Sequence, residues 1–155
     1  MKVEKCTKET FTVIGKEGST KDGEDFIERL WEDANKNFGE ISHLVKSDEE
    51  GVPVGVWGAM TDFSRSFKPW ENDFSEGLYL AGAECVDGAE APEGWVKWEI
   101  PAFEYLFTES DDDGEIFGEM LKYLEENGYE LAGAVHDFTC PRTGLSYMYF
   151  PIKAL

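Results

Sequence analysis

The segment 144–152, Gly-Leu-Ser-Tyr-Met-Tyr-Phe-Pro-Ile, decides how the rest of the chain is interpreted. It contains no charged residue, and its aromatic and aliphatic side chains favour a β-strand. Successive side chains of a strand alternate, so Tyr147 and Tyr149 share one face while Met148 and Phe150 share the other. A strand that is apolar on both faces needs two covers. One would be a helix, and the other could be further core or a bound ligand.

Three short motifs follow one another along the chain. They are Tyr-Leu-Ala-Gly-Ala-Glu-Cys at 79–85, Ile-Pro-Ala-Phe-Glu-Tyr at 100–105 and Tyr-Met-Tyr-Phe-Pro-Ile-Lys at 147–153. Together they resemble the gyrase-inhibitor-like effector-binding domains, which form the drug-binding halves of AraC-type and MerR-type regulators and also occur as free-standing proteins. The resemblance implies a free-standing, pseudo-twofold α+β domain with its ligand cleft between the two halves.

The composition is that of one acidic globular domain. The chain has 155 residues, which suits a single domain over 1–155 with one sizeable core, and 41% of them are hydrophobic. The formal net charge is −19, which repels phosphate backbones, so we expect no direct contact with nucleic acid. The same charge would attract cationic ligands, although solubility alone is a sufficient explanation for it.

The cysteines and histidines give no sign of a metal or cofactor site. Cys6, Cys85 and Cys140 are far apart and form no C-x-x-C pair, and the chain has only two histidines. An odd number of cysteines favours a reducing compartment. The N-terminus has no apolar signal core, and no apolar run is long enough for a membrane span. We therefore expect a cytoplasmic protein with no cofactor, no metal and no membrane contact.

The hydrophobic pattern repeats once along the chain. It predicts strands at 3–15, 52–60, 78–86, 95–107, 129–138 and 144–152, and helices with apolar faces at 27–38 and 116–124. A connector at 87–94 divides the chain into pseudo-repeats of about 1–88 and 95–155, each running strand-helix-strand-strand. Side by side, the repeats would form an α+β fold with one curved antiparallel sheet and both helices on one face.

The expected cleft lies on the face of the sheet opposite both helices, because the two helices leave that face without a cover. Segment 61–77 is long and aromatic, and it is either a lid over this cleft or a loop anchored by its own aromatic side chains. The acidic run 109–115 precedes the second helix, where acids favour the helix dipole, and it lacks the ligand spacing of an EF-hand.

Three residues are candidates for charge recognition or acid–base chemistry. Glu84 is surrounded by small and apolar residues, and a partly desolvated carboxylate would attract a cation or exchange protons, unless it faces outward from an edge strand. Glu104 has the same ambiguity. Relatives that bind cationic drugs carry a glutamate near the closing strand, but the matching residue here is Tyr147, which offers a hydroxyl and a π face. Tyr79 has the opposite strand parity to Glu84, and we favour Glu84.

The remaining ligand-binding candidates are aromatic. Trp57 stands between glycines and is either a stacking platform or a large side chain packed against small ones. Trp98 and His136 are candidates for the cleft, with core packing as the alternative for each. Tyr149 shares the face of Tyr147 and is included for that reason.

Three functions are compatible with these patterns. The first is a binding protein for a lipophilic small molecule, which could be cationic, held by aromatic walls and a buried carboxylate. The second is a hydrolase, because the resemblance includes members that hydrolyse strained electrophilic compounds with a cleft acid and a tyrosine. Glu84 or Glu104 with Tyr147 would then be the catalytic pair. The third is a protein-interaction module of the gyrase-inhibitor type.

Overall fold

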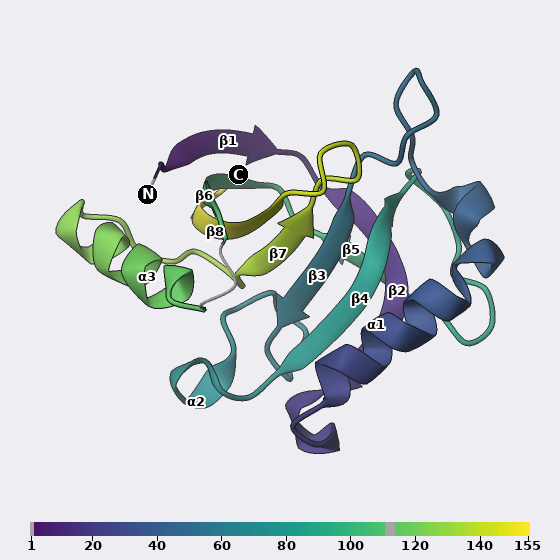
Figure 1. Cartoon of the computed structure of the whole chain (residues 1–155). Coiled ribbons are helices and arrows are strands. Elements are labelled where there is room, and N and C mark those ends of the chain that lie inside the picture. Colours follow the sequence, from purple (N-terminus) through teal and green to yellow (C-terminus); the bar gives the residue numbers. More distant parts are fainter. Residues whose placement is uncertain (1, 111–113) are drawn as a thin grey trace.

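The computed structural model describes residues 2–110 and 114–155, so residues 111–113 of the acidic run lie outside the described residues. Eight strands form one open antiparallel sheet (Figure 1). The strands are β1 (Glu4–Lys8), β2 (Phe11–Ser19), β3 (Val56–Thr61), β4 (Leu78–Cys85), β5 (Val96–Ile100), β6 (Phe103–Glu109), β7 (His136–Thr139) and β8 (Ser146–Ala154). The helices are α1 (Phe26–Lys36), the single turn α2 (Glu71–Phe74) and α3 (Ile116–Glu126).

The order of the elements confirms the predicted repeat and the α+β fold class. One unit is β2-α1-β3-β4 and the other is β6-α3-β7-β8. In the sheet the strands follow one another as β1-β6-β8-β7-β3-β4-β2-β5, so each unit keeps its strands together. The two units meet where β7 pairs with β3, with Asp137 opposite Gly58. This junction is therefore the middle of the sheet.

Each expected opening strand is two strands, which corrects the prediction. The stretch 3–15 forms β1 and β2, and the stretch 95–107 forms β5 and β6. β1 pairs with β6 of the other unit, and β5 pairs with β2 of the other unit. β1 and β5 are therefore the two edge strands of the sheet, and after each of them the chain crosses to a strand of its own unit, β2 or β6. In the second case Pro101 marks the break, because it has no N–H for the ladder.

The proline in the last strand does not end it, contrary to the prediction. Strand β8 continues to Ala154, with Pro151 opposite Tyr105. The register against β6 shifts at this point, between Glu104 and Tyr105. A β-bulge tolerates a residue without an N–H, because the ladder is already interrupted there.

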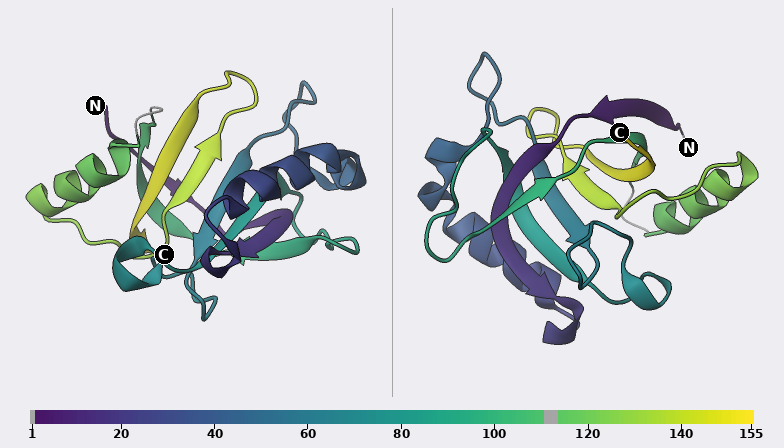
Figure 2. Two further views of the ribbon diagram at one scale, coloured as in Figure 1. Left: turned by 60° about the horizontal axis from the view of Figure 1, so that its bottom comes forward. Right: turned by 180° about the vertical axis from the view of Figure 1, so that it is seen from behind.

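Both long helices pack on one face of the sheet, as predicted, but at its two ends. α1 covers β2 and β4, while α3 covers β6 and β8. Figure 1 shows β7 and β3 between the two helices, and the turned view in Figure 2 keeps the same arrangement. Among the described residues, no helix has the length and apolar character needed to cross a membrane.

The opposite face of the sheet is covered by its own aromatic side chains. In the view from behind, β2 and β5 lie in front of α1 (Figure 2). The side chains buried on this face come from all parts of the sheet and include Phe11, Val13, Trp57, Leu80, Trp98, Ile100 and Tyr105. Large rings therefore fill the space that the sequence had led us to assign to a ligand.

Two glycines let strands β2 and β4 approach unusually closely. Gly15 and Gly82 are paired in the register. A Cβ atom on Gly82 would lie 2.3 Å from the carbonyl oxygen of Ile14, and one on Gly15 would lie 2.3 Å from that of Ala81. Backbone atoms cannot yield as a flexible side chain can, so both positions require glycine for steric reasons.

We predict that Gly82→Ala lowers the free energy of unfolding by about 1–3 kcal/mol, because the added methyl group overlaps the β2 backbone. Gly118→Ala is the matched control. Gly118 lies within α3, and a Cβ atom added there would meet no other atom within 4 Å, so alanine should add about 0.5–1 kcal/mol through helix propensity. Urea unfolding measures both changes, and equal stability of the two variants would contradict the steric argument.

Candidate functional site

The main cavity lies on the helix face, between α1 and α3. Its volume is about 580 Å³. Gly58, Asp137 and Met148 from the central strands line it, with Tyr79 of β4 and Trp31 of α1 on the side of the first unit. The cavity therefore lies at the junction of the two halves. The expected position on the opposite face is corrected: the helices cover only the two ends of their own face and leave its middle open.

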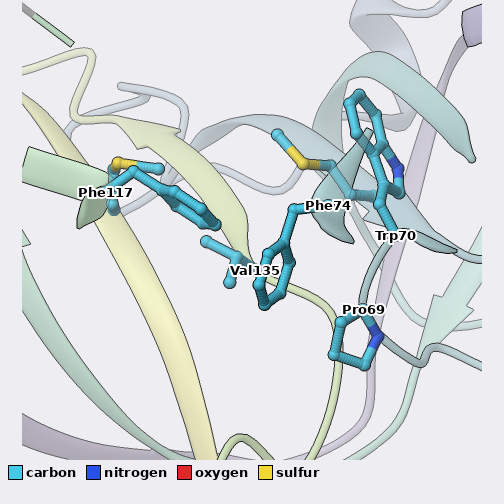
Figure 3. Close-up of a pocket in the computed structure, with 7 residues that line it drawn as sticks. Pro69, Trp70, Phe74, Phe117 and Val135 are labelled. Carbon is cyan, nitrogen blue, oxygen red and sulfur yellow. The ribbon is translucent and has the colours of Figure 1, made fainter. Parts of the chain in front are cut away.

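A smaller apolar cavity of about 220 Å³ adjoins the first, and Met148 lines both. Its walls come from both halves of the chain (Figure 3) and consist of Met60, Pro69, Trp70, Phe74, Phe117, Val135 and Met148. The ring of Phe74 lies between Trp70 and Val135 and contacts Phe117 of α3 edge-on, with ring centroids 5.2 Å apart. Together, the two cavities form a cleft with one polar and one apolar compartment.

Two acidic residues line the larger cavity, Glu109 at the end of β6 and Asp137 on β7, and Asp137 lies on its floor beside Gly58. It is partly buried, and it has no hydrogen-bond or ion-pair partner among residues 2–110 and 114–155. Loss of surrounding water disfavours the ionised form and raises the pKa of Asp137 to about 6. At neutral pH the group is therefore mostly charged but poorly solvated, which is the condition in which a carboxylate gains most from a bound cation.

Tyr79 and Trp31 form the wall beside this carboxylate. The Trp31 indole Nε1–H donates a hydrogen bond to the Tyr79 hydroxyl oxygen at 2.9 Å, and the two rings meet edge-on. Burial, with a smaller effect from the charge of Asp137, raises the pKa of Tyr79, so its hydroxyl stays protonated at neutral pH. A Cβ atom on Gly58 would lie 2.1 Å from the Tyr79 hydroxyl oxygen and 3.3 Å from Asp137 Cβ. The Tyr79 hydroxyl therefore occupies the position over Gly58 that a side chain would take, which glycine alone permits.

The segment after β3 forms a wall of the apolar cavity through Pro69, Trp70 and Phe74. Its first turn is organised by Asp62, which accepts hydrogen bonds from the Ser64 hydroxyl and the Ser66 N–H. Burial opposes ionisation of Asp62, but these hydrogen bonds outweigh it and lower its pKa. The segment also has five non-glycine residues with positive φ: Arg65, Phe67, Asn72, Asp73 and Phe74. Such backbone is held by its contacts, and a lid movement of this segment stays a prediction.

Glu84 does not line the cleft. It lies on the opposite face, where it is 5% exposed and accepts a hydrogen bond from Trp57 Nε1 at 3.1 Å. Lys8 Nζ lies 3.5 Å from the same carboxylate oxygen, and its ammonium also sits over the rings of Phe11 and Trp57. The charge that we assigned to a ligand is therefore balanced within the chain by a lysine of β1.

The aromatic candidates also lie on the opposite face. Trp57 is 1% exposed and packs against Phe138 and Tyr149, so it is core rather than an open platform. Tyr147 and Tyr149 pack around Phe107, and Tyr149 stacks on it at 4.8 Å. Ligand contact by these tyrosines stays a prediction, and neither lines the two cavities of the cleft.

The three other candidates have structural partners. His136 is fully buried, accepts a hydrogen bond from the Met60 N–H at 3.0 Å, and burial lowers its pKa to about 3, so it is neutral. Glu104 lies 3.8 Å from Lys5 Nζ near the edge of the sheet. Trp98 donates to Glu17 at 2.8 Å and lines a separate cavity of about 180 Å³. Within the described chain, no group of acids, histidines and cysteines is arranged to hold a metal ion.

The sequence analysis missed Asp137 and set Tyr79 aside. The available signal was an acid inside the apolar stretch 134–138, Ala-Val-His-Asp-Phe, where we singled out the histidine instead. Tyr79 was rejected because its parity differs from that of Glu84. That parity argument was sound, but the cleft lies on the face of Tyr79.

Solved structures with the same fold are known. The chain superposes on the C-terminal domain of EcmrR with a TM-score of 0.66 over 99% of its own length and 98% of that domain, at 11% identity. It covers 58% of the EcmrR chain in a cryo-EM complex with DNA. The TM-score with SAV2435, solved bound to tetraphenylphosphonium, is 0.65 at 14% identity, over 99% of this chain and 94% of that one. The chain has the fold of these domains.

A hydrolase from Listeria innocua is also similar, with a TM-score of 0.50 and 12% identity over 98% of this chain and 92% of that one. No protein-family model matches the chain, and no curated protein is similar to it in sequence. Similarities at these low identities establish the fold alone.

We predict that Glu84 contributes to stability rather than to ligand binding. Glu84→Gln should lower the free energy of unfolding by about 1–2 kcal/mol, because Lys8 and the Trp57 N–H lose a charged partner in a mostly buried place. A double-mutant cycle with Lys8→Met isolates the pair, and urea unfolding should give a coupling of about 1 kcal/mol. Strictly additive effects would show that the two side chains do not interact.

We predict that Asp137 makes the folded protein less stable as the pH rises. The pKa of Asp137 is about 6 in the folded protein, compared with 3.8 for an aspartate in an unstructured chain. As the pH rises between these two values, Asp137 ionises first in the unfolded chain, and this difference favours unfolding. The difference in unfolding free energy between wild type and Asp137→Asn should therefore grow by about 1–2 kcal/mol from about pH 4 to about pH 7, in favour of the variant, after allowance for partial exposure. A difference independent of pH would contradict the raised pKa.

Proposed function

We propose that this protein binds a lipophilic organic cation in the cleft between α1 and α3, with Asp137 as the counter-charge. The observation that carries the proposal is the partly buried carboxylate without a described partner, on the floor of a cavity that adjoins an apolar one. A cation would supply the missing partner for Asp137. Its hydrocarbon groups would fill the smaller apolar cavity, which Phe74 and Phe117 help to line.

The electrostatics and the cleft walls support a cation over an anion. The formal net charge of −19 attracts a cation from a distance, and Asp137 adds a local charge in a place where water is scarce. The aromatic rings of Trp31 and Tyr79 line the same cavity, and a cation placed over the face of an aromatic ring gains about 0.5–2 kcal/mol. With burial of apolar groups, a few such contacts give affinities of roughly micromolar Kd.

The structural neighbours support the same ligand class. SAV2435, which shares this fold over nearly its whole length, has been solved with tetraphenylphosphonium, a lipophilic cation. The C-terminal domain of EcmrR is the part of that DNA-bound protein to which this chain corresponds. We therefore infer a role in sensing or sequestering the ligand. A protein-interaction role of the gyrase-inhibitor type stays a prediction.

A hydrolase is the second candidate, favoured by a carboxylate with a raised pKa beside a tyrosine hydroxyl. In such a reaction ionised Asp137 would take a proton from water while the water oxygen attacks the electrophilic carbon. The strained bond to that carbon would break, and the departing atom would receive a proton from Tyr79. The similar hydrolase from Listeria innocua supports testing this activity. Tyr79 and Asp137 replace Tyr147 and Glu84 as the candidate pair.

Titration calorimetry with tetraphenylphosphonium tests the binding proposal. We expect Asp137→Asn to weaken binding at least tenfold at about pH 7.5, which corresponds to about 1.4 kcal/mol, and wild-type affinity to fall as the pH drops through about 6. Asp87→Asn removes the same charge from an exposed position beyond β4 and should leave the affinity within about twofold.

The isosteric anion tetraphenylborate separates charge from shape, because it has the same phenyl groups and the opposite sign. Equal affinity for both ions, or equal affinity of wild type and Asp137→Asn for the cation, would reject Asp137 as the counter-charge. Mass spectrometry after incubation with a panel of strained electrophiles would detect turnover, which favours the hydrolase.

A further inference from the structure

The hydroxyl of Tyr79 is a hydrogen-bond acceptor within the protein. Its partner is the Trp31 indole Nε1–H, at 2.9 Å. An indole nitrogen can only donate, so the Tyr79 oxygen must accept in this bond, and the phenolic proton remains free for a second one. Within residues 2–110 and 114–155, that hydroxyl donates no hydrogen bond to another residue.

The Tyr79 hydroxyl lies over Gly58, at the wall of the cavity that Asp137 also lines. Tyr79 and Asp137 both line the larger cavity, and Gly58 lies between them on β3, which pairs with β4 on one side and β7 on the other. A methyl group on Gly58 would collide with the Tyr79 hydroxyl at 2.1 Å. Because Gly58 has no side chain, the Tyr79 hydroxyl can lie over β3 on the side of the cavity that also carries Asp137, so one molecule bound in the cavity could reach both the hydroxyl and the carboxylate.

The Tyr79 hydroxyl and the Asp137 carboxylate would each bind a different chemical group of a ligand. The Tyr79 hydroxyl stays protonated at neutral pH because burial raises its pKa, so toward the ligand it acts as a donor. The Asp137 carboxylate accepts hydrogen bonds and attracts positive charge. A ligand that satisfies both must combine a positive charge with an oxygen that accepts a hydrogen bond.

We propose that Tyr79 is a specificity-determining residue that selects organic cations carrying a hydrogen-bond acceptor, such as a carbonyl or ether oxygen, close to the charged nitrogen. This inference rests on the cation-binding function proposed above and narrows its ligand class. A cation without an acceptor must displace water from the Tyr79 hydroxyl without replacing its hydrogen bond. A site built to donate a hydrogen bond discriminates against such analogues more strongly than an apolar pocket discriminates by size.

A pair of quaternary ammonium ions of equal length tests the proposal. Benzoylcholine carries an ester between its phenyl ring and its trimethylammonium group, and (4-phenylbutyl)trimethylammonium has an all-carbon chain of the same number of atoms. The informative quantity is the ratio of the two dissociation constants, because differences in hydrophobicity cancel when proteins are compared. We expect Tyr79→Phe to reduce the preference for benzoylcholine by about fivefold to tenfold while it leaves binding of the all-carbon ion near normal.

Two further variants keep the outcomes distinct. Asp137→Asn should weaken both ions to a similar degree and leave their ratio unchanged, because both carry the same charge. Tyr123→Phe removes a hydroxyl from α3, away from the residues that line the cleft, and should change neither affinity. Circular dichroism and thermal unfolding confirm that the Tyr79→Phe protein is folded.

The possible results separate this inference from the function on which it rests. If Tyr79→Phe changes both affinities equally, or neither, the role of Tyr79 is wrong while cation binding through Asp137 still stands. If neither ion binds the wild-type protein, or Asp137→Asn has no effect, cation binding through Asp137 is wrong and the selectivity inference is rejected with it. Selective loss of benzoylcholine in Tyr79→Phe, with parallel losses in Asp137→Asn, supports both.

Discussion

Two helices of 11 residues cannot cover one face of an eight-stranded sheet. Eight strands spaced about 4.8 Å apart span roughly 34 Å, whereas two helices with their side chains cover about 20 Å. Each helix packs on the strands of its own unit, so the uncovered part is the junction of β3 and β7. The cleft exists because neither helix covers the middle of the sheet. Its position follows from the repeat, which puts one helix at each end.

The face of the sheet opposite the helices is also apolar, but it is covered by side chains of the sheet itself and not by helices. Curvature brings aromatic side chains from many strands together, and β1 adds Lys8 above Glu84. A carboxylate that could have faced a ligand is instead part of an internal ion pair that also holds Trp57. The ring of Trp57 then packs against Phe138 and Tyr149. This face is closed because its charge and its apolar surface are both satisfied by the chain itself.

On the helix face, Asp137 has neither a described cation nor a described hydrogen-bond donor beside it, in contrast to Glu84. Its carboxylate is poorly solvated and has no described partner, and it lies near the Tyr79 hydroxyl, whose proton has no acceptor in the described part of the chain. Such a group destabilises the folded protein unless a ligand is bound, and natural proteins tend to retain groups of this kind where binding or catalysis requires them. Glu84 and Asp137 differ in whether the chain supplies a partner for the charge, and burial alone does not reveal this difference, since Glu84 is the more deeply buried of the two.

The sequence by itself determined the repeat, the two helices and the fold class, because hydrophobic periods of 2 and 3.6 residues are local properties of the chain. It also placed Glu84 and Tyr79 on different faces, since neighbouring residues of a strand alternate. Alternation does not state which face carries the helices, and a residue's own neighbours do not reveal a lysine 76 positions away. Only the tertiary structure paired Lys8 with Glu84, left Asp137 without a partner among the described residues and put Tyr79 beside it, because these outcomes depend on which strands become neighbours in the sheet.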